Sequence, residues 1–412
     1  MKRRKIFDAL MKQRNNKKIS LVLGARQVGK TTVLKELYIS LNSKNKAMFL
    51  DLDIFTNFEK VSTFENLINT IKLGGYNENQ KGFFYLFLDE FQRYKDISIV
   101  MKNVYDSFNN IKIYASGSSS IAIKDHIQES LAGRKIINIM YPLDFEEFLW
   151  FRESRLDAKN IKKLSGENLH KTTSSLLESL KEFIIFGGYP EVVLQKTKKE
   201  KIETLKSIFD LYIKKDLVEY LKIERILNVK KLIESMAINN CQKVKYETVS
   251  EICSLKFKEV KDYIEILQET YLIYVARPFF TNKSKELVKI PKIYFIDNGV
   301  RNFFINNFNP TELRDDAGFL FEAYVLSELL KSGKESIRFW QDKNAHEIDF
   351  LLDKAAIEVK FKTSLKQEDF IGLKAFTRQH KYVNKLYLIN LGVQKKEGKI
   401  IIKLPYLLGS IE

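Results

Sequence analysis

Two sets of residues, far apart in the chain, have types and spacing that could do chemistry. The first is the run Gly24-Ala25-Arg26-Gln27-Val28-Gly29-Lys30-Thr31, followed by Thr32. Glycines allow backbone N–H groups to close round phosphate oxygens, and a lysine that follows them can reach the outer phosphates. A hydroxyl beside that lysine can hold Mg²⁺. The run therefore predicts a binding site for ATP and Mg²⁺ over residues 24–32.

A pair of acids further along the chain completes this predicted site. The apolar run Tyr85-Leu86-Phe87-Leu88 ends at Asp89 and Glu90. An acid that leaves a buried strand can complete the shell of Mg²⁺, and its neighbour can orient or deprotonate an attacking water. We therefore predict Thr31 and Asp89 as metal ligands and Glu90 as a catalytic residue. The alternative, a glycine-rich turn beside an ordinary strand, leaves the joint occurrence of both motifs to chance.

Two further polar signals follow this pair. Ser116-Gly117-Ser118-Ser119 ends an apolar run, where a polar side chain could sense the outermost phosphate of ATP; a serine-rich turn is the alternative. Arg134 follows in Ser130-Leu131-Ala132-Gly133-Arg134. It could be an arginine finger or a sensor of the nucleotide, or only a solvated surface residue.

The second set lies near the carboxyl end and consists of Glu322, Asp349, Glu358 and Lys360. If residues 348–352 and 355–361 form a hairpin that turns at 353–354, Asp349 lies opposite Glu358 and Lys360 shares their face. Opposed carboxylates repel each other unless a divalent cation lies between them. We therefore predict Glu322, Asp349 and Glu358 as metal ligands, with Asp349, Glu358 and Lys360 catalytic. A charged hairpin on an inactive domain is the alternative.

The elements that must position these residues can be read from the apolar pattern. Short apolar runs at 19–23, 47–52, 83–88 and 112–115 alternate with helix-length segments, which indicates a parallel sheet covered by helices. Residues 196–305 read as helices followed by two strand-like runs, 272–276 and 292–296, the order of a winged helix. A compact α/β unit follows. The fold class is α/β, with predicted domains at 1–195, 196–305 and 306–412.

Composition narrows the class of protein less than the motifs do. The formal charge is +17, but the excess is mostly lysine and is spread along the chain, so it does not by itself indicate a nucleic-acid partner. Cys241 and Cys253 match no metal or redox spacing, which fits a reducing cytoplasm. We found no signal peptide and no apolar run long enough to cross a membrane, and we expect a soluble, cytoplasmic protein.

The order of short motifs resembles that of a family of uncharacterised prokaryotic AAA-type P-loop ATPases. The motifs are the two described above and Ser116–Ser119, Leu131–Arg134, Tyr141–Leu143, Phe145–Phe148, Gly187–Glu191, Tyr212–Asp216 and Lys292–Gly299. The resemblance covers nearly the whole chain. It implies an AAA-type domain at the amino end and, at the carboxyl end, a domain of unknown function similar to PD-(D/E)xK endonucleases. The set Glu322, Asp349, Glu358 and Lys360 is similar to that nuclease pattern.

These observations lead to a functional expectation with an alternative. We expect a Mg²⁺-dependent ATPase coupled to a domain that binds nucleic acid, expected to be DNA, and that could cleave it. The helix 258–269, with Lys256, Lys258 and Lys261 at its start, is a candidate DNA contact, although acids interleave with these lysines. The alternative is a nucleotide-controlled regulatory switch with an inactive nuclease-like domain. Assembly into a homo-oligomer is compatible with either function.

Overall fold

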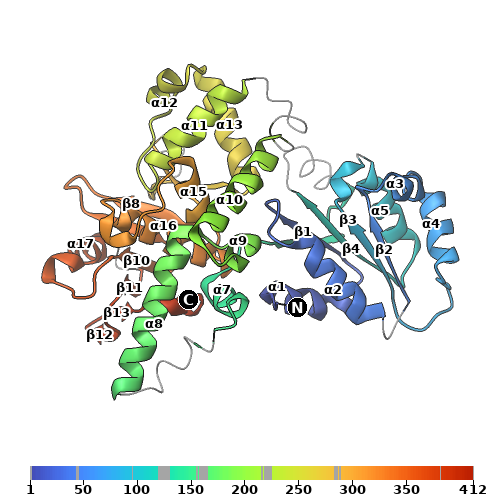
Figure 1. The fold of residues 1–412 in the computed structure, drawn as a ribbon, viewed down its shortest axis with the longest axis horizontal. Helices are drawn as coiled ribbons and strands as arrows, with labels where there is room; N and C mark the ends of the chain where they lie inside the picture. The colour runs from blue at the N-terminus through green and yellow to red at the C-terminus, as the bar shows by residue number, and fades with distance from the viewer. Residues whose placement is uncertain are drawn as a thin grey trace. The chain divides into compact units, whose positions relative to one another are not determined.

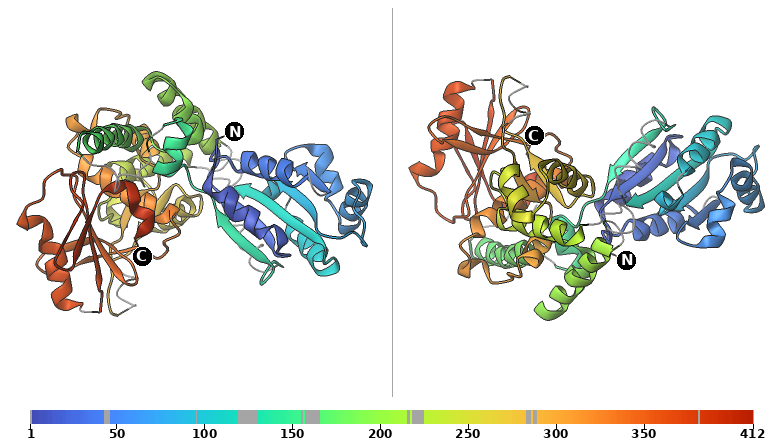
Figure 2. Two further views of the ribbon diagram at one scale, coloured as in Figure 1. Left: turned by 90° about the horizontal axis from the view of Figure 1, so that it is seen from below. Right: turned by 90° about the horizontal axis from the view of Figure 1, so that it is seen from above.

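The computed structural model describes residues 2–42, 46–94, 96–118, 130–154, 156, 166–214, 217, 225–282, 286, 289–380 and 382–411. The chain divides into two compact units, and Figure 1 and Figure 2 show the ribbon of each. The first unit comprises Met1–Pro142 with Glu269–Tyr271, and the second comprises Leu143–Gln268 with Leu272–Glu412. The division between these units follows Pro142, and the predicted domains at 1–195, 196–305 and 306–412 stay a prediction. Ser119, Lys215 and Asp216, all part of motifs named in the sequence, lie outside the described residues.

The first unit contains a five-stranded sheet of order β2-β3-β4-β1-β5, in which every pair is parallel. Its elements are α1 (Lys5–Lys12), β1 (Ile19–Gly24), α2 (Lys30–Asn42), β2 (Ala47–Asp51), α3 (Phe55–Lys60), α4 (Phe64–Leu73), β3 (Phe84–Asp89), α5 (Ile97–Ser107), β4 (Ile111–Ser118) and β5 (Lys135–Ile139). The residues of β1, β3 and β4 are buried throughout, as expected for central strands of a parallel sheet. The four predicted strands are confirmed. The fifth, β5, was not predicted, because it is a half-exposed edge strand without a continuous apolar run.

The second unit begins with helices. They are α7 (Phe145–Phe151), α8 (Gly166–Phe186), α9 (Pro190–Leu194), α10 (Lys198–Tyr212), α11 (Ile226–Ile238), α12 (Tyr246–Cys253) and α13 (Phe257–Glu269). An antiparallel ribbon of β6 (Ile273–Ala276) and β7 (Lys292–Phe295) follows, so both predicted strands are present in the expected order. The next helix is α15 (Asn298–Phe304), which packs against α8, α10 and α11. None of the described helices is long and apolar enough to cross a bilayer.

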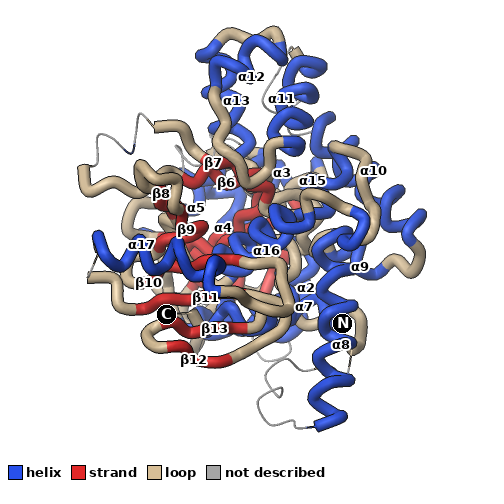
Figure 3. The backbone as a smooth tube through the Cα atoms, turned by 90° about the vertical axis from the view of Figure 1, so that its left-hand side faces the viewer, coloured by secondary structure: helices blue, strands red, loops and turns tan. Residues whose placement is uncertain are grey.

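The carboxyl-terminal part of the second unit is a six-stranded mixed sheet of order β12-β13-β11-β10-β9-β8. The elements of this part are α16 (Ala317–Lys331), β8 (Arg338–Gln341), β9 (Glu347–Leu351), β10 (Ala355–Val359), α17 (Ile371–Gln379), β11 (Lys385–Ile389), β12 (Lys395–Glu397) and β13 (Ile400–Lys403). Helix α17 lies against β9 and β10, as the tube in Figure 3 shows. The predicted hairpin register is confirmed: Phe350 pairs with Ile357, and the Leu352 N–H donates to the Ala355 carbonyl at 2.8 Å.

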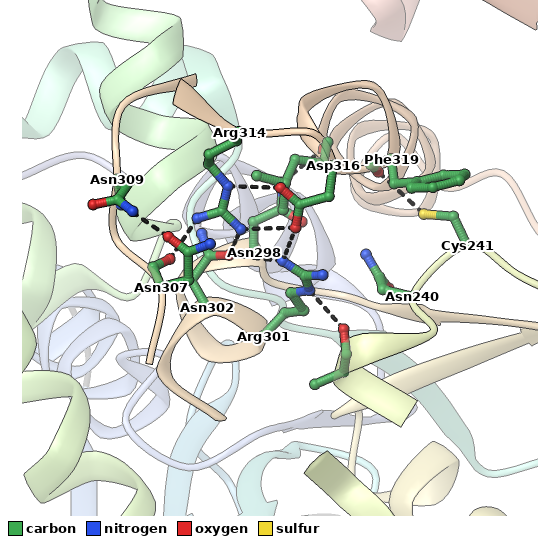
Figure 4. Close-up of polar contacts among 12 residues, drawn as sticks. Asn240, Cys241, Asn298, Arg301, Asn302, Asn307, Asn309, Arg314, Asp316 and Phe319 are labelled. Atoms are coloured by element: carbon green, nitrogen blue, oxygen red, sulfur yellow. Dashed lines mark hydrogen bonds and ion pairs between the residues drawn. The ribbon is translucent and has the colours of Figure 1, made fainter. Parts of the chain in front are cut away.

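A buried polar network fixes α15 and the segment that precedes α16, and Figure 4 shows it in detail. Asp316 accepts hydrogen bonds from two arginines, Arg301 and Arg314. Arg301 also donates to the Ala237 carbonyl at 2.7 Å, and Arg314 donates to Asn302 at 3.0 Å. Because both guanidinium groups are almost fully buried, this charged partner is necessary for their burial. The two arginines hold the pKa of Asp316 at about 2 against the opposing effect of burial.

Candidate functional site

The predicted phosphate loop lies between the end of β1 and the start of α2. Gly24 is the last residue of β1, and a Cβ there would lie 2.1 Å from the Met140 carbonyl oxygen. Gln27 and Gly29 have φ values of 60° and 96°, so the loop turns twice through the left-handed region. The loop leads directly into α2, whose N-terminus presents N–H groups and a favourable dipole to an anion. This local geometry is that of an anion-binding loop.

Lys30 is folded back onto the loop in this structure. Its Nζ donates to the Gly24 carbonyl at 3.0 Å and to the Ala25 carbonyl at 2.7 Å. The side chain is buried, so its charge needs these oxygens. Phosphate oxygens could replace them without a change of fold.

Asp89 stands at the carboxyl end of β3, and β4 separates this strand from β1, which leads into the loop. Its carboxylate accepts hydrogen bonds from Ser116 at the end of β4 and from Thr31 of α2. Burial raises the pKa of Asp89, and these two hydrogen bonds oppose that rise. The predicted metal ligands Thr31 and Asp89 are thus brought together, and a hydroxyl beside a buried carboxylate is a donor set that suits Mg²⁺. Ser116 orients Asp89 in this structure, and its role as a phosphate sensor stays a prediction.

Glu90 follows Asp89 in a left-handed conformation, with φ of 52°. Its carboxylate accepts a hydrogen bond from the side chain of Gln92, which holds it beside the strand end. Non-glycine residues rarely adopt this region of φ and ψ, and those that do occur often at functional sites. The other predicted loop residues, Ala25, Arg26 and Val28, lie in the loop as expected, whereas Thr32 is exposed on α2.

Arg134 is not brought to this site within its own chain. It immediately precedes β5, whose first residue, Lys135, pairs with Ile19 at the start of β1, whereas the phosphate loop follows the end of β1. At about 3.3 Å per residue, that strand separates Arg134 from the loop by roughly 16 Å. Arg134 binds both carboxylate oxygens of Asp106, at 2.8 and 3.1 Å, and is partly exposed. A role in catalysis would therefore require the site of another copy.

The residues predicted near the carboxyl end lie together. Glu322 is on α16, Asp349 is on β9, Glu358 is on β10 and Lys360 follows that strand. The Asp349 carboxylate accepts from the Val359 N–H at 2.8 Å, and Lys360 Nζ donates to Glu358 Oε1 at 2.5 Å. The other oxygen of Glu358, Oε2, is buried and has no hydrogen-bond partner. This unsatisfied oxygen needs a physical explanation, because such groups are costly in a folded protein.

Sequence reasoning missed three members of this cluster. Lys292 and Tyr294 come from β7: Tyr294 Oη donates to Glu322 Oε1 at 2.6 Å, and Lys292 Nζ lies 3.4 Å from the same oxygen. Lys292 also pairs with Glu347 of β9. A lysine and a tyrosine two residues apart in an apolar strand share one face, and that spacing was the available signal.

The electrostatics of the cluster favour added positive charge or protons. It contains four carboxyl groups, of Glu322, Glu347, Asp349 and Glu358, against two ammonium groups, of Lys292 and Lys360. Burial raises the pKa of Glu322 to about 7 despite Lys292 nearby. Burial and the charge of Asp349 raise the pKa of Glu358 as well. Burial alone would lower the pKa of Lys292, but the neighbouring carboxylates outweigh that effect and raise it.

The predicted metal set Glu322, Asp349 and Glu358 is not preassembled. Within the described part of the chain, no three His, Cys, Asp or Glu side chains are arranged to hold a metal ion. The physical reason is that ammonium groups neutralise part of the carboxylate charge: Lys292 forms an ion pair with Glu322, and Lys360 forms one with Glu358. The roles of Glu322, Asp349 and Glu358 as metal ligands stay a prediction.

The chain matches three known domain families. Residues 16–149 match an AAA domain, residues 177–311 match a domain of unknown function (DUF8612) and residues 317–407 match a domain of unknown function (DUF4143). The first match contains the phosphate loop with Asp89 and Glu90, and the third contains the carboxyl-terminal acids. The sheet of the first unit with its P-loop is accordingly of the AAA ATPase type.

Whole-chain relatives extend over most of the molecule. An uncharacterised protein of Methanocaldococcus jannaschii is 32% identical over 358 residues, which are 81% of this chain and 72% of the relative. An uncharacterised protein of Haemophilus influenzae is 25% identical over 350 residues, 82% of this chain and 80% of the relative. Among solved structures, Cdc6p from Pyrobaculum aerophilum is 11% identical, with a TM-score of 0.29 and coverage of 74% and 93%. The chain therefore belongs to a family of archaeal and bacterial proteins that includes these two relatives, and it combines an AAA domain with a carboxyl-terminal DUF4143 domain.

Proposed function

We propose that this protein binds and hydrolyses ATP with Mg²⁺ in its AAA domain. The observation that carries the proposal is the hydrogen-bonded set of Thr31, Asp89 and Ser116 beside a phosphate loop that its own Lys30 closes. Each of these residues lies at the carboxyl edge of the parallel sheet, where α/β proteins bind their ligands.

The residues have separate tasks in this proposal. Lys30 exchanges the carbonyl oxygens of Gly24 and Ala25 for phosphate oxygens, and the loop N–H groups bind the same phosphates. Thr31 and Asp89 would hold Mg²⁺, which neutralises charge on the phosphates when it is bound. Glu90, held by Gln92, orients the attacking water and accepts its proton.

Paired substitutions test this assignment. Lys30→Ala should lower the affinity for ATP, whereas Glu90→Gln should keep that affinity and lower kcat by about 10²-fold or more. Glu59→Gln, an exposed acid of α3, is the matched control and should retain wild-type turnover. Phosphate release and nucleotide affinity are measured with and without Mg²⁺. Wild-type turnover by Glu90→Gln would disprove the role of Glu90.

We propose a second function for the carboxyl-terminal cluster: binding of a divalent cation and cleavage of nucleic acid. The specific observation is the buried, unpartnered Glu358 Oε2 in a cluster with twice as many carboxyl as ammonium groups. A divalent cation would satisfy both the oxygen and the excess charge, provided that the carboxylates converge from their present positions. Lys360 is placed to stabilise the charge of a phosphate.

Calorimetry and cleavage assays test this second function. Asp349→Ala, Glu358→Ala and Lys360→Ala should each abolish cutting of DNA or RNA while ATP turnover is kept. Asp353→Ala, in the turn of the same hairpin and 92% exposed, is the control. Absence of Mg²⁺ or Mn²⁺ binding, together with intact substrates, would favour the regulatory switch, in which the terminal domain only binds.

The proposed nucleic-acid partner also has a candidate contact on α13. Lys256, Lys258 and Lys261 are exposed at the start of this helix. Glu259 lies among them, accepts from the Lys256 N–H at 2.7 Å and lies 3.6 Å from Arg225, which reduces the local positive potential. Replacing the three lysines by alanine should weaken DNA binding and flatten its salt dependence. Unchanged affinity and slope would leave α13 as a packing element.

A further inference from the structure

The N-terminal segment delivers an arginine to the phosphate loop. Arg4 immediately precedes α1 and is 6% exposed. Its Nη1 donates to the Val28 carbonyl at 2.7 Å, and its Nη2 donates to the Tyr141 carbonyl at 2.8 Å. A single guanidinium group therefore bridges the loop and the segment that follows β5, 137 residues further along the chain.

The bond to Val28 determines which way a loop N–H group points. The Val28 carbonyl and the Gly29 N–H belong to one planar trans peptide, in which the two groups point in opposite directions. Because the carbonyl is directed at Arg4, the Gly29 N–H is directed away from Arg4. Gly29 has a φ of 96°, in a region where glycine is free to turn, so the peptide needs an external restraint to keep one orientation.

The bond to Tyr141 gives that restraint a firm base. The adjacent Met140 N–H donates to the Leu23 carbonyl at 2.7 Å, so this segment continues the pairing of β5 with β1. The guanidinium thus spans from the loop that follows β1 to the segment after β5. A planar group with a fixed fork of donors suits two carbonyls at a set separation better than a lysine would.

We propose that Arg4 is a positioning residue for the nucleotide site, which presets the Gly29 N–H toward the phosphates of the bound nucleotide. The proposal rests on the proposed ATP-binding function and adds to it a residue outside the phosphate-loop motif. Arg4 does not itself touch the nucleotide in this role. It removes the freedom of the Val28–Gly29 peptide before binding, and preorganisation of this kind raises affinity without a new contact.

The test compares Arg4→Met with Arg3→Met in the full chain. Arg3 is the matched control, since it is the neighbouring arginine and forms an exposed ion pair with Asp8 at 2.6 Å. Affinities for ATP, ADP and adenosine are measured for each protein, with the thermal unfolding midpoint as a check of folding. In Arg4→Met, ATP and ADP should bind about tenfold more weakly, which corresponds to loss of one hydrogen bond to a charged group, while adenosine binding is unchanged. Arg3→Met should match the wild type.

The outcomes separate this role from a merely structural one. Equal weakening of adenosine and ATP, or unchanged ATP affinity in a folded Arg4→Met, overturns the positioning role alone. If Arg4→Met does not fold, Arg4→Lys replaces it, since a lysine can donate to one of the two carbonyls. Partial loss of ATP affinity with intact adenosine binding then supports the positioning role. Wild-type ATP affinity overturns it. A wild-type protein that binds no ATP overturns the proposed function and this role together.

Discussion

At the scale of single residues, Lys112 shows how a buried charge can be kept without a carboxylate as its hydrogen-bond acceptor. It lies in β4 and is 0% exposed, and its Nζ donates to the Lys18 carbonyl and to Ser20 Oγ. Burial lowers the pKa of Lys112 to about 7 from an ordinary value of 10.5. The folded protein therefore resists protonation of this amine more than the unfolded chain does.

The sign of the resulting pH dependence can be stated. The ammonium form destabilises the fold below pH 10.5, the effect grows as the pH falls, and it reaches its full size below about pH 7. We predict that Lys112→Met unfolds at a higher temperature relative to the wild type at pH 6 than at pH 9. Ser20 keeps a partner in this variant, because its Oγ also donates to Gln13 at 2.7 Å.

Thermal unfolding at several pH values measures this effect. Each kcal/mol of added stability should raise the midpoint by about 2–4 °C in a unit of this size. Lys81→Met, at an exposed position of the same unit, is the control and should show no such trend. A difference between Lys112→Met and the wild type that does not change between pH 6 and pH 9 would contradict the assignment.

At the scale of elements, two of the motifs that carry the family resemblance meet at the end of α8. Asp297 caps α15 through the Val300 N–H at 3.2 Å and accepts from the Gly188 N–H at 2.7 Å. A Cβ at Gly187 would lie 2.0 Å from Asp297 Oδ1, and one at Gly299 would lie 2.0 Å from the Phe186 carbonyl oxygen. These glycines and Asp297 therefore form a close joint between α8 and α15, and their part is structural.

A pair of glycine substitutions isolates this joint. Gly187 and Gly333 have similar φ values, 76° and 83°, but a Cβ at Gly333 would meet no described atom within 4 Å. Gly333→Ala should lower the free energy of unfolding by about 1–2 kcal/mol, which is the strain that a side chain adds in the left-handed conformation. Gly187→Ala should lower the free energy of unfolding by roughly 2 kcal/mol more, because buried Asp297 must move from its hydrogen bonds with Gly188 and Val300. Equal losses in urea unfolding would show that the contact with Asp297 contributes nothing.

At the scale of the whole molecule, the position of Arg134 leads to a prediction about assembly. Arg134 precedes β5 and lies at the amino ends of the parallel strands, whereas the phosphate loop of the same chain lies at their carboxyl ends. A hydrogen bond to Asp106 holds Arg134 in this position. We predict that an arginine so placed acts on the site of a second copy, so ATP turnover per chain should rise with protein concentration. Loss of an arginine supplied by another copy can lower phosphoryl transfer by about 10³-fold or more.

Mixing two inactive variants tests this prediction directly. Arg134→Ala keeps Glu90, and Glu90→Gln keeps Arg134, so a mixed assembly can contain complete sites. Partial recovery of turnover on mixing is expected, with ATP affinity largely kept in Arg134→Ala alone. Arg152→Ala, a partly exposed arginine of the second unit that pairs with Glu182, is the control. Concentration-independent turnover in a strictly monomeric sample would disprove the role in a second copy.

The sequence by itself determined the features that depend on local order along the chain. The phosphate loop, four of the five strands of the first sheet and the register of the hairpin around 353–354 follow from periodicity and turn spacing. Asp349 and Glu358 came out on opposed strands because the pairing of a short hairpin is fixed by its turn. These contacts are near in sequence, so side-chain pattern is enough to specify them.

Only the tertiary structure decided the contacts between distant segments. Arg4 reaches Val28 and Tyr141, Lys292 and Tyr294 reach Glu322, and Asp297 reaches Gly188 across 109 residues. A lysine or aspartate in an apolar segment indicates that its charge will need a partner in the folded protein. Which partner it contacts depends on how helices and sheets pack. For that reason the sequence predicted the carboxyl-terminal acids as metal ligands. The fold also places the ammonium groups of Lys292 and Lys360 in ion pairs with Glu322 and Glu358.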